Sequence, residues 1–287
     1  MSERFRCLLL FLLWFSNSAV TAGYFLSGGT SGTNLRRKPV LIFPGFASSR
    51  LRVWKTVDCP WGPDFAPGGA VWVDATMVFG SQSCWLMCMK LDPTDQRDPP
   101  LCPVRRIAQS SQIRPDEGID AVTQIDPGLI TGQLTDLWRA MVESLGSFGW
   151  SPPSTLIAVP YDWRLAPMLL EERDSFFSGL KSTIEHAVHR AQRGIIAIGH
   201  SHGNNILRYF LEWLKADIGS LHYQEWVDKH LYMYIACGAP LLGASNPVRG
   251  VVSGVTMGLP ISDLSARFTT NMTNARSLMV RFTDTWR

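Results

Sequence analysis

The sequence has 287 residues, of which 46% are hydrophobic and 18% are charged, and its formal net charge is +3. This apolar content is enough for a sizeable globular core, and α/β proteins of about 250 residues are often single domains. The charge excess is small and scattered along the chain, so a nucleic-acid partner is excluded. The eleven tryptophans fit a large core, although tryptophan is also common at lipid interfaces.

The N-terminal residues have the pattern of an export signal. Two arginines precede an apolar run from Cys7 to Phe15, and small residues follow up to Ala22. We expect residues 1–22 to be a cleaved signal peptide, because the apolar run is shorter than the ~20 residues that a membrane span needs. An uncleaved membrane anchor is the alternative. A glycosylation sequon at Asn271 agrees with the secretory pathway, with the endoplasmic reticulum lumen, the vacuole or lysosome, or the exterior as the destination.

Short apolar strands alternate with amphipathic helices from residue 39 onward. The run Val40–Phe43 predicts a buried strand that stops at Pro44-Gly45. Strands separated by helices predict an α/β fold with a mostly parallel sheet, and ligand sites then lie beyond the carboxyl ends of the strands. The domain is expected over residues 38–265, followed by an unpatterned tail at 266–287. The other elements expected are helices at 133–147, 169–192 and 204–215 and strands at 156–159, 194–198 and 231–237.

Residues 59–118 interrupt this alternation, because they are rich in Pro, Gly, Cys and Asp and have no sustained period. A loop of this length is usually functional, so we interpret it as an insert. In an oxidising compartment its four cysteines favour disulfides. A zinc site is the alternative, but no second closely spaced pair completes it. Cys237 is expected to be buried and unreactive. The disulfides expected are Cys59–Cys84 and Cys88–Cys102.

The pentapeptide Gly199–Gly203 fits the pattern G-x-S-x-G. The pattern is weak alone, but here an apolar strand runs straight into it and an amphipathic helix runs straight out. That context predicts a nucleophile elbow, which lifts the hydroxyl of Ser201 out of the sheet toward a substrate. The alternative is a serine in an ordinary strand–helix connection.

An elbow serine requires donors for the negative charge that develops on the substrate. We expect one from the backbone N–H of His202, at the N-terminus of the following helix. The second donor usually comes from the loop after an early strand, which assigns the backbone N–H of Phe46. A simple Pro-Gly turn is the alternative at that place. The rings of His200 and His202 should point away from Ser201, so neither is expected to be the base.

Four segments in this order resemble the lecithin–cholesterol acyltransferase family, and the resemblance covers residues 38–265. Residues 207–214 and 88–93 are similar to its phospholipid–sterol O-acyltransferase branch in particular. The resemblance implies an α/β-hydrolase that moves a fatty acyl group from a phospholipid to a sterol through an acyl-serine, at a membrane or lipid surface and without cofactor or metal. The segments are Pro44–Ser48, Pro160–Arg164, His200–Asn205 and Gly238–Gly243.

In this resemblance the loop from Cys59 to Cys84 corresponds to a lid that contacts lipid, with Trp61 among its aromatic residues. An aromatic flap would admit acyl chains and exclude water, which decides between acyl transfer and hydrolysis. Ordinary loop packing is the alternative for these aromatics. Trp163 and Arg164 close a strand at the carboxyl edge of the sheet, where a phospholipid head group could bind. A structural ion pair between Asp162 and Arg164 is the other interpretation.

The acid and base of a catalytic triad are not found in the expected places. The fold orders its triad as serine, acid and histidine, but no histidine follows the strand that ends at Cys237. His222 and His230 precede that strand. We therefore expect a C-terminally incomplete sequence without useful acyl transfer on its own, because loss of the base costs a serine protease ~10⁶-fold in rate. The alternatives are a phospholipase A or lipase, and a non-catalytic lipid-binding fragment.

Overall fold

The computed structural model describes residues 37–54, 68–72, 112–125 and 136–245, together with residues 74, 85, 89, 91 and 96–98. Several predictions lie outside the described residues: the signal peptide at 1–22, Trp61, Cys59, Cys84, Cys88, Cys102, Asn271 and the tail at 266–287.

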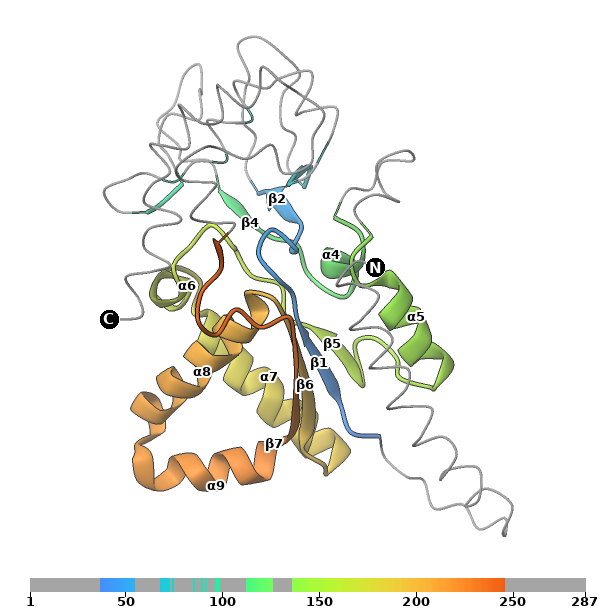
Figure 1. Ribbon diagram of the computed structural model, residues 1–287, viewed down its shortest axis with the longest axis vertical. Coiled ribbons are helices and arrows are strands. Elements are labelled where there is room, and N and C mark those ends of the chain that lie inside the picture. Colours follow the sequence, from blue (N-terminus) through green and yellow to red (C-terminus); the bar gives the residue numbers. More distant parts are fainter. Residues whose placement is uncertain are drawn as a thin grey trace.

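The centre of the molecule is a parallel sheet of four strands in the order β5-β1-β6-β7 (Figure 1). In its middle, Ile42 of β1 pairs with Ala158 on one side and with Ile198 on the other. All of β1 is buried, as expected for a strand that is covered on both faces. The predicted parallel sheet is therefore confirmed. Its strands are β1 (Val40–Phe43), β5 (Leu156–Ala158), β6 (Ile195–His200) and β7 (Leu231–Cys237).

Helices cover both faces of this sheet, and the side chains of β1 alternate between the two cores. Leu41 and Phe43 belong to the core shared with α6, α7, α8 and α9. Val40 and Ile42 belong to the core shared with α4 and α5, on the opposite side (Figure 1). The alternation follows from the two-residue period of a strand. The helices are α4 (Asp120–Thr123), α5 (Arg139–Ser147), α6 (Pro167–Asp174), α7 (Phe176–Ala191), α8 (Gly203–Ile218) and α9 (Ser220–His230).

The single helix predicted at 169–192 is wrong, because the chain forms two helices there. Ser175 separates α6 from α7 and adopts a left-handed backbone conformation with φ of 50°. The carboxylate of Glu171 accepts hydrogen bonds from the backbone N–H groups of Phe177 (2.7 Å) and Ser178 (3.1 Å). These are two of the N–H groups that a helix start leaves without a partner. The side chain of Glu171, which lies in α6, therefore caps the start of α7. The chain forms two helices here instead of one long helix.

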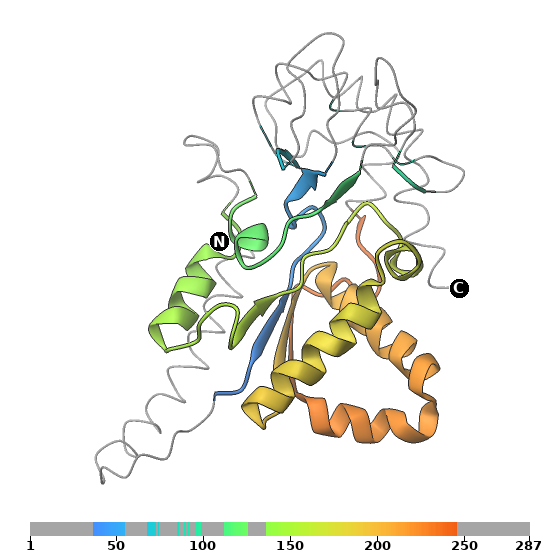
Figure 2. The same ribbon diagram turned by 180° about the vertical axis from the view of Figure 1, so that it is seen from behind.

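A second, antiparallel sheet in the order β3-β2-β4 lies beyond the carboxyl ends of the parallel strands (Figure 2). Two of its strands fall within residues 59–118, for which no strand was predicted. Each strand has only three residues, too few for an alternating pattern to be read from the sequence. The strands are β2 (Leu51–Val53), β3 (Ala70–Trp72) and β4 (Ile113–Pro115). In the part of the chain that is described, no helix has the length and hydrophobicity needed to cross a bilayer.

Candidate active site

Ser201 lies in a sharp turn between β6 and α8. Its φ is 50°, in the left-handed region that residues other than glycine rarely adopt and that often marks functional sites. Two backbone hydrogen bonds hold this conformation: the Ser201 N–H donates to the Cys237 carbonyl (2.9 Å), and the Ser201 carbonyl accepts from the Asn204 N–H (3.1 Å). Ser201 is partly exposed while Cys237 is buried. The turn thus has the strand–turn–helix geometry that a nucleophile elbow requires.

Both glycines of the pentapeptide are needed because other groups pack closely against them. A Cβ atom on Gly203 would lie 2.6 Å from the carbonyl oxygen of Pro44, and closer still to that of Phe43. A Cβ atom on Gly199 would lie 2.9 Å from the side-chain Cγ of Asn204. The start of α8 therefore sits directly against the end of β1, which brings the loop after β1 to the serine.

We expect the substitution Gly203→Ala to lower the free energy of unfolding by about 3 kcal/mol, because the overlap is with backbone that cannot rotate away. Gly179→Ala is the matched control, since a Cβ on Gly179 in α7 would meet nothing within 4 Å. That change should stabilise the helix by about 0.5–1 kcal/mol. Urea unfolding of both variants checks the prediction, and a Gly203→Ala variant as stable as the control would contradict the packing described.

Hydrogen bonds of Asn204 connect the turn at Ser201 to the end of β7. Its side-chain Nδ2 donates to the carbonyl oxygens of Ser201 (2.9 Å) and Cys237 (3.2 Å), and its Oδ1 accepts from the hydroxyl of Tyr234 (2.6 Å). The residue is fully buried, so these bonds are shielded from water. Asn204 was not among the predicted site residues, although a polar amide directly after the elbow glycine, at a position facing the core, could have indicated it.

Of the two residues predicted to supply backbone donors, one is next to Ser201 in the chain, and the other follows a glycine that packs against Ser201. His202 follows it directly and is the N-cap residue of α8. Phe46 follows Gly45, whose Cβ would lie only 3.1 Å from the Cβ of Ser201 and 3.1 Å from Nδ1 of His200. The loop after β1 and the N-terminus of α8 therefore meet at the serine. Backbone N–H groups at a helix N-terminus favour negative charge, as an oxyanion site requires.

The sequence contains six histidines, and three of their rings pack against aromatic side chains. The ring of His200 meets Trp138 edge-on (6.0 Å between centroids), and that of His202 lies 6.1 Å from Tyr161. His230 stacks on Trp226 at 4.3 Å. Burial lowers the pKa of His202 to about 4, so its ring is neutral near pH 7. Because each of the three rings packs against an aromatic side chain, we assign none of them the role of base for Ser201.

The lowered pKa of His202 predicts a stability change with pH. Between pH 6.5 and 4 the unfolded chain protonates this ring while the folded chain does not, so stability falls as the pH falls through this window. The shift corresponds to about 3 kcal/mol at 1.36 kcal/mol per pKa unit. Urea unfolding at pH 7 and pH 4 should show the wild type losing that much more stability than His202→Leu. Equal losses in both proteins would contradict the prediction.

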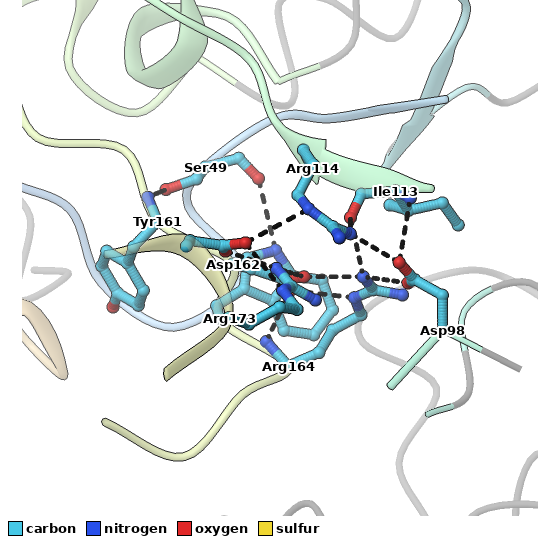
Figure 3. Close-up of polar contacts among 10 residues, drawn as sticks. Ser49, Asp98, Ile113, Arg114, Tyr161, Asp162, Arg164 and Arg173 are labelled. Atoms are coloured by element: carbon cyan, nitrogen blue, oxygen red, sulfur yellow. Dashed lines mark hydrogen bonds and ion pairs between the residues drawn. The ribbon is translucent and has the colours of Figure 1, made fainter. Parts of the chain in front are cut away.

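Six charged side chains form a cluster at the carboxyl edge of the parallel sheet, and Figure 3 shows Asp98, Arg164 and Asp162 near its centre. Nη2 of Arg164 lies 2.6 Å from Asp162 and 3.0 Å from Asp98, and it also donates to the carbonyl of Ile113 (3.3 Å). Three acids face three bases, so the cluster is neutral overall. The members of this charge cluster are Asp98, Arg114, Asp162, Arg164, Arg173 and Asp174.

The charge cluster ties the insert to the parallel sheet. Asp98 and Arg114 come from residues 59–118, whereas Asp162 and Arg164 follow β5. Burial alone would raise the pKa of Asp162, but the charges and hydrogen bonds of Arg164 and Arg173 outweigh it and hold that pKa well below its usual value. The carboxylate therefore stays charged, and the ion pairs connect segments far apart in the sequence.

The surroundings of Trp163 and Arg164 bear on their predicted contact with substrate. Arg164 is 1% exposed, and its guanidinium is engaged by the acids of the charge cluster. Trp163 is also buried, with its ring edge-on to Phe46 at 5.0 Å between centroids. These contacts favour the structural ion pair that the sequence left open for Arg164, and they place Trp163 behind the loop that contains Phe46.

The fold and this turn together define a class: an α/β protein with a G-x-S-x-G serine at the carboxyl edge of a parallel sheet. The family model of lecithin:cholesterol acyltransferase matches residues 69–285. The chain therefore belongs to the lecithin:cholesterol acyltransferase family.

Similar proteins include acyltransferases with different named acceptors. The chain is 45% identical over 232 residues to a phospholipid–sterol O-acyltransferase of Arabidopsis thaliana, covering 80% of this chain and 35% of the relative. It is 30% identical to a phospholipid:diacylglycerol acyltransferase of Saccharomyces cerevisiae, covering 76% of this chain and 32% of the relative. It is 29% identical to a lysosomal phospholipase A and acyltransferase of Mus musculus, covering 51% and 33%. The chain thus spans about a third of the length of these relatives.

Proposed function

We propose that the full-length protein containing this sequence is a serine O-acyltransferase with an α/β-hydrolase fold, which moves a fatty acyl group from a phospholipid to a sterol. The observation that carries the proposal is the left-handed Ser201 at the end of β6, held between two glycines that admit no side chain. The choice of phospholipid as donor and sterol as acceptor is supported by the name of the Arabidopsis thaliana relative.

In the first half of the reaction the Ser201 hydroxyl attacks the ester carbonyl of the phospholipid. The backbone N–H groups of Phe46 and His202 stabilise the resulting oxyanion, and each donor lowers the barrier by roughly 3–4 kcal/mol. The intermediate collapses to an acyl-serine, and the lysophospholipid alcohol leaves with the proton from Ser201. In the second half the sterol hydroxyl attacks the acyl-serine, and the proton returns to Ser201 as the steryl ester is released.

Proton transfer in both halves needs a general base, since an unactivated serine hydroxyl is a poor nucleophile. The rings of His200, His202 and His230 pack against aromatic side chains, so we assign the base to none of these three. We propose that the base and its acid partner come from another part of the protein. The matched stretch covers only 35% and 32% of two acyltransferase relatives.

The insert at 59–118 is proposed to cover the site at a lipid surface. In that proposal Trp61 contacts lipid, and the pairs Cys59–Cys84 and Cys88–Cys102 stabilise the cover in the secretory pathway. Residues 1–22 would direct the protein there, and Asn271 would be glycosylated. Support comes from the aromatic and cysteine content of the insert.

The second candidate is hydrolysis, with water as the acyl acceptor. The name of the Mus musculus relative, a lysosomal phospholipase A and acyltransferase, favours it. The test is to incubate the full-length protein with vesicles of acyl-labelled phospholipid and sterol and to separate the products. Steryl ester is the expected product. Free fatty acid alone would favour the phospholipase, and no product would favour a non-catalytic lipid-binding protein.

A further inference from the structure

The loop between β1 and β2 is held by hydrogen bonds from three aromatic side chains of distant segments. We call residues 44–49 the oxyanion loop, because it contains Phe46. Each of the three side chains is buried and donates to a carbonyl oxygen of this loop. The bonds are Tyr161 Oη to Pro44 (3.0 Å), Trp72 Nε1 to Ala47 (2.8 Å) and Trp163 Nε1 to Ser49 (3.3 Å).

Two of the three donors also contact each other through their rings. Trp163 lies edge-on to Phe46 and to Trp72, at 5.0 Å between centroids in both cases. A third bond joins the segment after β5 to the loop, from the Tyr161 N–H to Oγ of Ser49 (3.2 Å). Burial raises the pKa of the Tyr161 hydroxyl, so it remains a donor at every physiological pH.

The hydrogen bonds of the oxyanion loop determine the direction in which the Phe46 N–H points. A turn bond from the Ser48 N–H to the Gly45 carbonyl (3.1 Å) orients the peptide plane that joins Gly45 to Phe46. In a trans peptide the N–H points opposite to the carbonyl, so this bond also sets the direction of the Phe46 N–H. The bond of Tyr161 to Pro44 fixes the preceding peptide plane, and the bond of Trp72 to Ala47 fixes the plane that joins Ala47 to Ser48, later in the same turn. The turn is strained, since φ of Ala47 is 58°, and it needs such support to persist.

We infer that Trp72, Tyr161 and Trp163 are positioning residues for the oxyanion loop, and that the insert is an integral part of the site through Trp72. Trp72 ends β3 and lies within residues 59–118, so the insert supports the back of the loop in addition to any role as a cover. Only the expected effect on kcat rests on the proposed function. The support of the loop is a separate, structural statement.

The test compares Tyr161→Phe and Trp72→Phe with the wild type of the full-length protein. Each variant removes one donor and retains an aromatic ring. We expect kcat to fall by about 10- to 100-fold, because a small misplacement of an oxyanion donor is costly. KM for phospholipid vesicles should stay within about twofold, because the loop carbonyls are bonded to buried side chains. Hydrogen exchange of the amides of residues 45–49 should become faster in both variants.

Trp226→Phe is the matched control. Trp226 is a buried tryptophan of α9, and its indole donates at 2.8 Å to the carboxylate of Glu185, outside the oxyanion loop. This variant should lose a similar bond and keep both its kcat and the exchange rates of residues 45–49. Equal changes in Trp72→Phe and Trp226→Phe would overturn the inference, as would unchanged exchange in Tyr161→Phe.

The exchange measurement separates this inference from the proposed function. Ser201→Ala tests the nucleophile and should leave exchange of residues 45–49 unchanged. If Ser201→Ala kept full activity, the proposed function would fail, while faster exchange in Tyr161→Phe would still support the inference. If Ser201→Ala were inactive but Tyr161→Phe had normal kcat and normal exchange, only the inference would fail.

Discussion

Replacing Ser201 with alanine is expected to lower kcat of the full-length protein by about 10⁵- to 10⁶-fold, as loss of the nucleophile does in a well-studied serine protease. The cause is chemical, because the substitution removes the hydroxyl that the proposed reaction acylates. The fold should persist, since the hydroxyl belongs to a partly exposed side chain. The free energy of unfolding is expected to stay within about 0.5–1 kcal/mol of the wild type.

Ser175→Ala is a matched control for this substitution. Ser175 has the same φ of 50° as Ser201 but lies between α6 and α7, so the same change of side chain is made on the same backbone conformation. Its activity should equal that of the wild type. Ser201→Gly adds a second readout, because glycine relieves left-handed strain and should raise stability by about 1 kcal/mol while activity is lost. Residual activity above about 1% in Ser201→Ala would rule out Ser201 as the nucleophile.

Replacing Asp162 with asparagine is expected to lower the free energy of unfolding by about 3–5 kcal/mol, the usual cost of removing one partner from a buried ion pair. Asp162 is fully buried and binds both Arg164 (2.6 Å) and Arg173 (2.8 Å). An amide of the same shape cannot balance the two guanidinium charges. Because the charge cluster joins the insert to the sheet, exchange of amides in β4 should become faster as well.

Asp217→Asn is the control for this second prediction. Its ion pair with Lys181 has a similar length of 2.9 Å, but the carboxylate is 39% exposed. Exposed pairs contribute little, so a loss of at most about 0.5 kcal/mol is expected. Urea unfolding of both variants at pH 7 provides the comparison. A loss in Asp162→Asn no larger than that in Asp217→Asn would show that the charge cluster does not stabilise the fold.

Acid should reproduce the effect of Asp162→Asn in the wild type. The pKa of Asp162 is depressed in the folded state below its ordinary value of 3.8, so its contribution to stability is fully present above about pH 4. The contribution is lost as the pH falls below that value toward the folded pKa. Asp162→Asn has no such group and should show a correspondingly weaker loss of stability below pH 4.

The parallel sheet and the serine turn could be predicted because their determinants are local. Val40–Phe43 is a continuous apolar run that ends at Pro-Gly, and the glycines at 199 and 203 flank the serine directly. The break at Ser175 could not be predicted, because neither glycine nor proline marks it. Its cause is the cap that Glu171 provides to α7, which competes with continuation of the helix.

The charge cluster and the supports of the oxyanion loop depend on contacts between distant residues. Arg164 binds Asp98, which lies 66 positions earlier, and Tyr161 binds Pro44 across 117 positions. A sequence pattern shows that a buried arginine needs a partner, but it does not show which acid supplies it. For this reason the sequence did not predict that the indole of Trp72 supports the loop of the proposed donor Phe46.

The most direct test of the account is to find where the enzyme is acylated. The full-length protein is treated with a serine-reactive fluorophosphonate, digested and analysed by mass spectrometry. A single adduct on the peptide that contains Ser201, absent from Ser201→Ala and present in Ser175→Ala, is the predicted result. An active enzyme that carries its adduct on another serine, or none on Ser201, would contradict the assignment of that hydroxyl as the acyl acceptor.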